Sequence, residues 1–182
     1  MYNNSVGGID AQLAGLRAAL MIATILDRVL ILPRFHCFNN STRSFVECPL
    51  NSLLNIIAFD AGFAGHYRES SFLRHPLVPD AVRRSISRQY VIATPPVNGT
   101  DTIPVPSDHS NTTNVVRRNN TGSISDDELR QLLGTDQHRI VSLATLDHVR
   151  VTFKSAAQQQ TFNETVRTSF KRSDYRQLHL FT

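Results

Sequence analysis

The chain has 182 residues, of which 41% are hydrophobic and 19% charged, and it carries a formal net charge of +4. These proportions are those of a globular protein, and the length suits one domain that buries roughly 70% of its unfolded surface without needing a metal. Of the basic residues only Lys154 and Lys171 are lysines, and the arginines form small clusters without interleaved aromatic residues. This pattern argues against a nucleic-acid partner.

The first predicted element is a helix over residues 10–27. Its polar side chains are confined to one side of a helical wheel, so we expect most of its surface to be buried. Gly7 and Gly8 permit a tight entry into the helix, and Asp10 is the expected N-cap. Residues 29–32 follow as a continuous aliphatic run, which is typical of a strand covered on both faces in a parallel sheet.

The rest of the chain alternates in the same way. We predict a polar loop at 38–44 and then a helix at 49–59 with Leu50, Leu53, Leu54 and Ile57 on one face. A helix at 79–89 and a strand at 90–94 follow, and then a long polar loop at about 95–123. The last predicted elements are a helix at 125–133 closed by Gly134, strands at 140–144 and 149–153, and a helix at 161–170. The class is therefore α/β, with a Rossmann-like parallel sheet and flanking helices in a single domain. Because no signal or anchor precedes the first helix, we expect a fragment of a longer enzyme.

The glycine turn is the first candidate site. Free N–H groups at a helix N-terminus attract a diphosphate, and Gly7 and Gly8 would let the ligand approach the main chain. Gln12, one turn further, could reach a ribose or sugar hydroxyl, and Arg17 could balance phosphate charge if its side chain bends back. The alternative is that the glycines form only a turn and that Arg17 holds a carboxylate beside the buried helix.

The second candidate site is the polar run at residues 66–76. Arg68 and Glu69 precede an apolar pair and could line a pocket, with Arg68 on a phosphate and Glu69 as a catalytic base, or they could form a solvated turn. The acidic run at 126–128 resembles a metal site, but Ser125 followed three residues later by Glu128 indicates a capping box. The segment contains no Asp-x-Asp, so we expect no metal ligands here.

Cysteines and asparagines point to the secretory lumen. A disulfide between Cys37 and Cys48 would close a twelve-residue loop, the alternatives being two buried thiols or half of a metal site. The N-glycosylation pattern Asn-x-Ser/Thr occurs seven times where about two are expected by chance. The seven positions are Asn3, Asn39, Asn40, Asn98, Asn111, Asn119 and Asn163.

Three ordered blocks resemble the C-terminal half of the plant and algal arabinosyltransferases. They are residues 17–37, then Phe45 with Cys48-Pro49-Leu50, then residues 67–73 with Pro76 and Pro79. This resemblance implies a Golgi enzyme of type II topology that uses a nucleotide sugar to arabinosylate cell-wall glycoproteins, with a divalent metal such as Mn²⁺ held by a domain upstream. Asn51 and Ser52 depart from the family, which usually has Asp-His there.

Residues 7–33 also resemble the protein O-fucosyltransferases, which begin with a similar glycine turn, alanine-rich helix and strand ending in proline. We therefore expect part of a lumenal glycosyltransferase that transfers a sugar, a pentose such as arabinose by the first resemblance, to a glycoprotein or glycan hydroxyl. An O-fucosyltransferase-like enzyme is one alternative, and an accessory module that binds acceptor without catalysis is another. Membrane attachment would need an anchor outside this chain.

Overall fold

The computed structural model describes residues 8–93, 114–117, 123–134, 140–143, 146 and 149–170, with the main chain alone for 86–93, 114–117 and 142. This part of the protein is mixed α/β, as predicted, with five α-helices. Parallel pairing occurs in three small sheets, the largest of three strands, and not in one continuous sheet. None of the described helices is both long and apolar enough to cross a bilayer.

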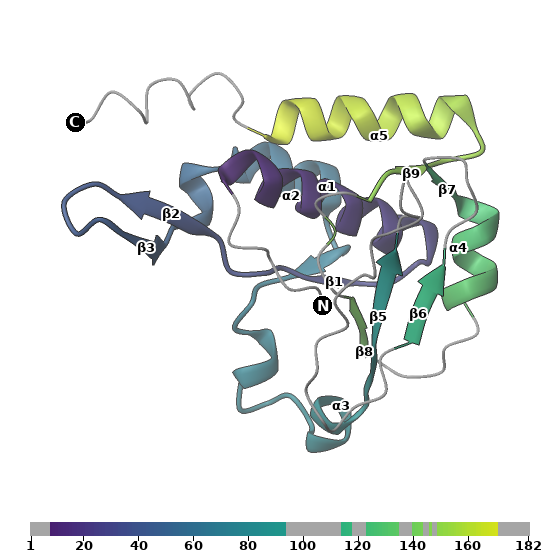
Figure 1. The fold of residues 1–182 in the computed structure, drawn as a ribbon, viewed down its shortest axis with the longest axis horizontal. Helices are drawn as coiled ribbons and strands as arrows, with labels where there is room; N and C mark the ends of the chain where they lie inside the picture. The colour runs from purple at the N-terminus through teal and green to yellow at the C-terminus, as the bar shows by residue number, and fades with distance from the viewer. Residues whose placement is uncertain are drawn as a thin grey trace, which may run out of the picture.

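Helix α1 (Ile9–Ile25) is the centre of the core (Figure 1). It is buried on most of its surface, as its sequence predicts, and Leu16 is fully covered. The N-cap prediction was wrong, because Gly8 takes the N-cap position and Asp10 lies inside the first turn. The helix ends at Ile25 with Leu26 as its C-cap, Asp27 then takes a left-handed φ of 52°, and the amide of Arg28 bonds to the carbonyl of Ala23 at 2.9 Å.

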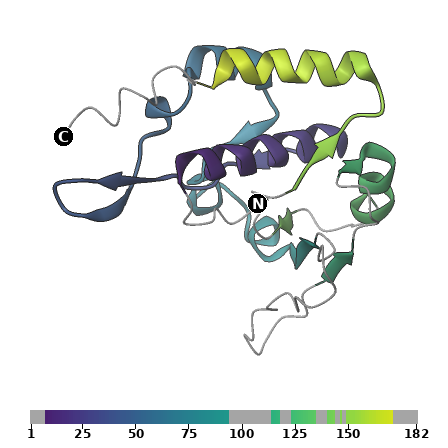
Figure 2. The same ribbon diagram turned by 45° about the horizontal axis from the view of Figure 1, so that its top comes forward.

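Strand β1 (Leu30–Ile31) pairs in parallel with β4 (Tyr67–Arg68), which confirms the parallel pairing predicted for this strand. In the sequence between β1 and β4, strands β2 (His36–Asn39) and β3 (Ser44–Glu47) form an antiparallel hairpin. A polar loop had been predicted there over residues 38–44. Only the connection at 40–43 is a turn. Both views show the hairpin extending away from the body of the molecule (Figures 1 and 2).

One helix was predicted at 49–59, but two elements form, the 3-10 turn η1 (Leu50–Ser52) and helix α2 (Ile56–Phe63). The side chain of Asn55 accepts a hydrogen bond from the amide of Ala58 and starts a new helix with a different phase. Leu53 and Leu54 are buried as expected, whereas Ile57 is 84% exposed. The prediction for Ile57 was therefore wrong.

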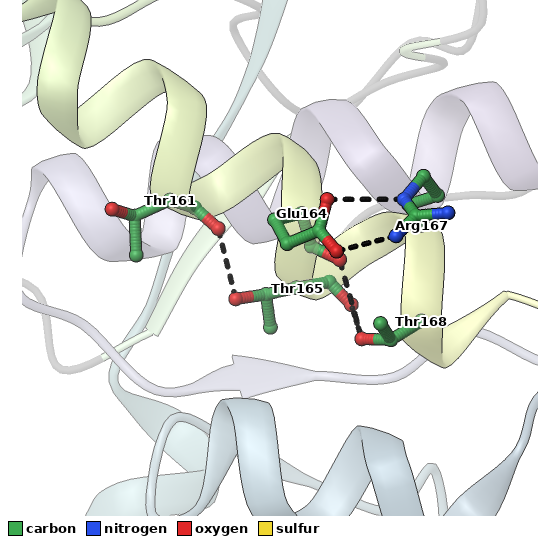
Figure 3. A network of polar contacts seen from close by, with 5 residues as sticks. All are labelled: Thr161, Glu164, Thr165, Arg167 and Thr168. Atoms are coloured by element: carbon green, nitrogen blue, oxygen red, sulfur yellow. Dashed lines mark hydrogen bonds and ion pairs between the residues drawn. The ribbon is translucent and has the colours of Figure 1, made fainter.

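Helix α5 (Ala156–Ser169) packs on α2 through a close contact at Gly62. A Cβ built on Gly62 would lie 2.3 Å from Cγ2 of Thr165, so a larger residue would push the helices apart. The rings of Phe63 and Phe162 meet edge to face at 6.0 Å. Polar side chains elsewhere on α5 bond along the helix itself, as Figure 3 shows for Thr161, Glu164, Thr165, Arg167 and Thr168.

The three-stranded sheet has the order β6-β5-β8, all parallel, built from β5 (Ile86–Ala93), β6 (Asn114–Arg117) and β8 (Ile140–Leu143). It is preceded by the 3-10 turn η2 (Phe72–Arg74) and by α3 (Asp80–Arg84). The helix predicted at 79–89 thus stops early, and β5 begins four residues before the predicted strand. Strand β6 lies inside the segment predicted as a loop at about 95–123, of which residues 95–113 and 118–122 are outside the described residues.

The last sheet pairs β7 (Ile124–Ser125) with β9 (Val151–Thr152) in parallel, and α4 (Asp126–Leu133) follows β7 directly. The capping box of α4 is confirmed, since the amide of Glu128 bonds to Oγ of Ser125 and the amide of Ser125 bonds to Oε2 of Glu128. The acidic run at 126–128 therefore serves the start of a helix.

Candidate functional site

The N-terminus of α1 is open to solvent. Gly8 is exposed, and its carbonyl accepts the amide of Gln12 at 3.2 Å, which closes the first turn. No described side chain caps this helix, so the first-turn amides keep their capacity to bind an anion. Asp10 is exposed in the same turn, and its negative charge would repel an anionic ligand bound there. Gly7, predicted to join this site, lies outside the described residues.

Gln12 does not face a ligand. Its side chain is 1% exposed, and Nε2 donates to the carbonyl of His36 at 2.8 Å while Oε1 accepts the amide of His36 at 2.9 Å. This pair of hydrogen bonds ties the first turn of α1 to the segment that follows β1. The first turn of α1 is therefore fixed to the start of β2, five residues beyond the end of β1.

Arg68 and Glu69 lie where β1 and β4 end, because β4 runs parallel to β1 and ends at Arg68. Both residues are exposed. Nη1 of Arg68 donates a hydrogen bond to the carbonyl of Tyr67 at 2.8 Å, and Oε2 of Glu69 accepts a hydrogen bond from Oγ of Ser71 at 3.4 Å. The guanidinium and the carboxylate are thus placed at the carboxyl ends of parallel strands, where α/β proteins bind their ligands.

The phenol of Tyr67 lies beside this edge and donates to Oδ1 of Asp60. Burial, with the hydrogen bond to Asp60 and the negative charges of Asp60 and Glu69 adding to it, raises the pKa of Tyr67 to about 12. Since the phenol stays protonated at neutral pH, its hydroxyl acts here as a hydrogen-bond donor between β4 and α2.

Arg17 is not part of this arrangement. It lies more than two turns along α1, and its Nη2 donates to Oδ1 of Asn163 on α5 at 2.7 Å. The structure thus has Arg17 in a structural contact, with a side-chain amide in place of the carboxylate considered from the sequence. Of the predicted ligand contacts, Gly8 is exposed at the start of α1 and Arg68 lies at the end of β4, next to the predicted base Glu69, while Gln12 and Arg17 make structural contacts.

A cavity of about 330 Å³ lies near the other end of α1. Two arginines, Arg28 and Arg68, contribute to its lining, and Arg68 alone among the predicted site residues is part of it. The other lining residues are apolar: Ala19, Ile22, Ala23, Leu26, Val29, Leu30, Ile31, Phe72, Val82, Ile140, Val141 and Leu143. One related feature is visible in the sequence, since the segment of α1 is apolar on the face of Ala19 and Ala23, where a surface helix would be polar.

The cysteine prediction is confirmed: Cys37 and Cys48 form a disulfide at the base of the β2–β3 hairpin, with a Cα–Cα distance of 5.5 Å. Two predicted glycosylation sites, Asn39 and Asn40, lie at the turn of that hairpin, and Oδ1 of Asn39 accepts the amide of Ser41 at 2.9 Å. Asn163 is exposed on α5. The other four, Asn3, Asn98, Asn111 and Asn119, lie outside the described residues.

Within the described ranges, no group of three or more His, Cys, Asp or Glu side chains is close enough to hold a metal ion. The acidic side chains of α4 have other contacts, since Oδ2 of Asp127 accepts Nζ of Lys154 at 2.8 Å and the pKa of Lys154 is raised by that hydrogen bond and charge. Comparison of the chain with known families, curated proteins and solved structures finds no match. The family resemblance thus stays a prediction from three sequence blocks.

Proposed function

We propose that this chain is the donor-binding part of a lumenal glycosyltransferase of the Golgi, which transfers a pentose such as arabinose from a nucleotide sugar to a glycoprotein or glycan hydroxyl. We further propose that its small parallel sheets belong to a Rossmann-like arrangement. The observation that supports this most is the exposed N-terminus of α1 at Gly8, which no described side chain caps, together with the exposed Arg68 at the carboxyl end of β4.

In this proposal the diphosphate of the donor binds the first-turn amides after Gly8, and Arg68 neutralises its second charge. Sugar transfer depends chiefly on positioning the donor and stabilising the departing diphosphate, so amides and a guanidinium suffice for this part of the site. Glu69, beside Arg68, is the group available to take the proton of the acceptor hydroxyl. A divalent ion such as Mn²⁺, if used, would need ligands from a domain outside this chain.

The disulfide and the exposed asparagines support the lumenal location. Disulfides persist in oxidising compartments, and Cys37–Cys48 closes a hairpin whose turn carries two glycosylation patterns. Expression in a secretory host followed by enzymatic removal of N-linked glycans tests the location. We expect the mobility of the chain to increase on gels, and an unchanged mobility would contradict it.

Donor binding is tested by titration calorimetry with a UDP-pentose and with GDP-fucose, each with Mn²⁺ present. Gly8→Ala is an informative variant, because a Cβ at Gly8 meets no atom within 4 Å in the protein and can only obstruct the ligand. We expect Gly8→Ala and Arg68→Ala each to weaken the dissociation constant at least tenfold. Arg74→Ala, at an exposed arginine of η2, is the matched control and should leave it unchanged.

Absence of binding to any nucleotide sugar would contradict the proposed function. Binding that both variants leave intact would show that the donor binds elsewhere. Where binding is confirmed, transfer to a hydroxyproline-rich peptide separates an enzyme from an accessory module, and Glu69→Gln should then lower kcat with little effect on donor affinity.

A further inference from the structure

The β2–β3 hairpin carries a pair of aromatic side chains on one of its faces. Phe38 and Phe45 are directly opposite each other in the strand register, and their rings meet edge to face with centroids 5.5 Å apart. The two residues are 54% and 48% exposed, and neither belongs to the buried core. The hairpin extends away from the body of the molecule (Figures 1 and 2). Single apolar side chains on a surface need no explanation, but an aromatic pair on a projecting arm indicates an interaction surface.

The same hairpin carries two overlapping N-glycosylation patterns, and the structure distinguishes their two asparagines. Asn39 is the last residue of β2 and pairs with Ser44, and its Oδ1 accepts hydrogen bonds from the amides of Ser41 and Thr42 at 2.9 and 3.4 Å. Asn40 is exposed, whereas Asn39 is half-buried. Asn40 is therefore the more accessible of the two.

Strand alternation places the two asparagines on different faces of the hairpin. Successive side chains of a strand point to opposite faces, so Asn39 lies on the face opposite Phe38. Asn40 follows the strand directly, and continuing the alternation by one residue returns its side chain to the face of Phe38. A group attached to Asn40 thus starts beside the aromatic pair, whereas a group attached to Asn39 starts on the far face.

We propose that Asn40 carries the N-linked glycan of this hairpin, and that the first N-acetylglucosamine packs on the rings of Phe38 and Phe45. The faces of a pyranose present C–H groups, and their slight positive charge is attracted to the negative face of an aromatic ring. Because the sugar is tethered two residues from Phe38, its packing costs less entropy than the binding of a free ligand. The glycan is also bulky and solubilising, which suits an apolar pair on an exposed arm.

The disulfide supports this assignment independently of the sugar. Cys37 and Cys48 are joined at the base of the hairpin, and Cys37 directly precedes Phe38. Disulfides persist in the oxidising compartments of the secretory route, where asparagine is also glycosylated. The cross-link holds the base of the hairpin together next to the aromatic pair. The inference rests on the lumenal location proposed above, and it does not depend on nucleotide-sugar binding.

The position of the glycan is tested by peptide mass spectrometry. The full chain is expressed in a secretory host, and its N-linked glycans are removed enzymatically in ¹⁸O-labelled water, which marks each glycosylated asparagine. Ser41→Ala is an informative variant, because it destroys the pattern that begins at Asn39 and keeps the pattern of Asn40 and Thr42. We expect labelling of Asn40 to exceed that of Asn39 at least tenfold in the unmodified chain, and to persist in Ser41→Ala. Equal or greater labelling of Asn39 would overturn the proposal.

The same experiment separates this inference from the proposed location. Labelling of other asparagines, such as Asn163 on α5, with Asn40 unlabelled would overturn the inference and leave the lumenal location standing. Absence of label at every pattern of the chain would overturn both.

Packing on the rings is tested with Ser41→Ala protein that an endoglycosidase has trimmed to a single N-acetylglucosamine. The reference is the same protein with Asn40→Gln, which carries no sugar there. We expect the sugar to raise the melting temperature by roughly 2–4 °C, the scale of one modest contact in a chain of this length. Phe38→Thr combined with Phe45→Thr should abolish this difference. Ile57→Thr, at an 84% exposed residue of α2, is the matched control and should preserve it.

A direct readout needs no variant that could disturb the hairpin. In NMR spectra of the single-sugar protein, we expect ring-current shifts of the N-acetylglucosamine protons to high field and Overhauser contacts with the rings of Phe38 and Phe45. Sugar protons at their free-solution positions would overturn the proposal even with Asn40 glycosylated. A glycosylated chain that dimerises in sedimentation analysis, and loses the dimer on Phe38→Thr with Phe45→Thr, would show that a second copy covers the aromatic face. That result would also overturn the proposal.

Discussion

The two ends of helix α1 are fixed in different ways. At the N-terminus the buried side chain of Gln12 bonds to the main chain of His36, and the helix opening at Gly8 stays exposed. At the C-terminus the fixing contact is between main-chain groups, because Asp27 takes a left-handed φ and the amide of Arg28 bonds to the carbonyl of Ala23. The cavity lies beside the last turns of the helix. The difference between the two ends shows that a polar side chain near a candidate ligand site, here Gln12, can serve to hold the main chain of that site in place and need not contact the ligand itself.

Removing the Gln12 contact should have the largest effect. Gln12→Ala removes a buried side chain and leaves the half-buried amide and carbonyl of His36 without this partner, so we expect the free energy of unfolding to fall by about 3 kcal/mol. Urea denaturation measures it. The matched control is Gln160→Ala at an exposed position of α5, which should change stability by less than about 0.5 kcal/mol.

If Gln12→Ala were as stable as the control, the hydrogen bonds to His36 would not hold the helix end. The same variant should also lose affinity for a nucleotide sugar, since the first turn of α1, whose amides bind the diphosphate in the proposal, would no longer be fixed to the main chain of His36. If Gln12→Ala lost stability but kept its donor affinity, Gln12 would stabilise the fold without positioning the donor site. That result would contradict the proposed position of the donor.

The disulfide lies next to the contact that fixes the N-terminus of α1, since Cys37 directly follows His36 in the chain. Replacing both Cys37 and Cys48 by Ala removes a cross-link over a twelve-residue loop, and we expect a loss of about 3 kcal/mol from the chain-entropy model. Chemical reduction of the unmodified protein should give a similar loss. The cavity end of α1 should be unaffected, so a change in hydrogen exchange at Leu30 and Ile31 would contradict the separation of the two ends.

The sequence predicted what local patterns determine. The apolar run of α1 and the aliphatic strand after it specified a buried helix and a parallel strand, and Ser125 with Glu128 specified the start of α4. Prediction failed where a local signal was overridden. Asn55 restarted a helix in a new phase, so Ile57 was placed on the wrong face.

The candidate site was less predictable than the fold. Gln12 and Arg17 carry groups that suit a ligand and suit a buried contact equally, and only the distant partners His36 and Asn163 decide between the two. The cavity could not be predicted either, because it depends on how β8, far along the chain, lies beside β1. Sequence spacing contains no information about such contacts.

The C-terminal end of α1 offers a gain in stability. Asp27 has a φ of 52°, which a residue with a Cβ adopts at a cost and glycine adopts freely. Asp27→Gly should raise the free energy of unfolding by about 0.5–1 kcal/mol, measured by thermal or urea denaturation. Asp27→Ala keeps the Cβ and should give no gain. A gain with alanine would show that the charge at residue 27, and not the backbone, limits stability.

The smallest expected effect concerns the exposed end of α1. The carboxylate of Asp10 lies in the first turn, where it interacts favourably with the helix dipole and repels an anion at the same amides. Asp10→Asn should therefore lower stability slightly and tighten donor binding about two- to fivefold, the equivalent of about 0.5–1 kcal/mol. Asp80→Asn, in the first turn of α3, is the matched control and should leave donor affinity unchanged. Equal effects of the two substitutions would indicate a general change in net charge, and the donor would then not be bound at the N-terminus of α1.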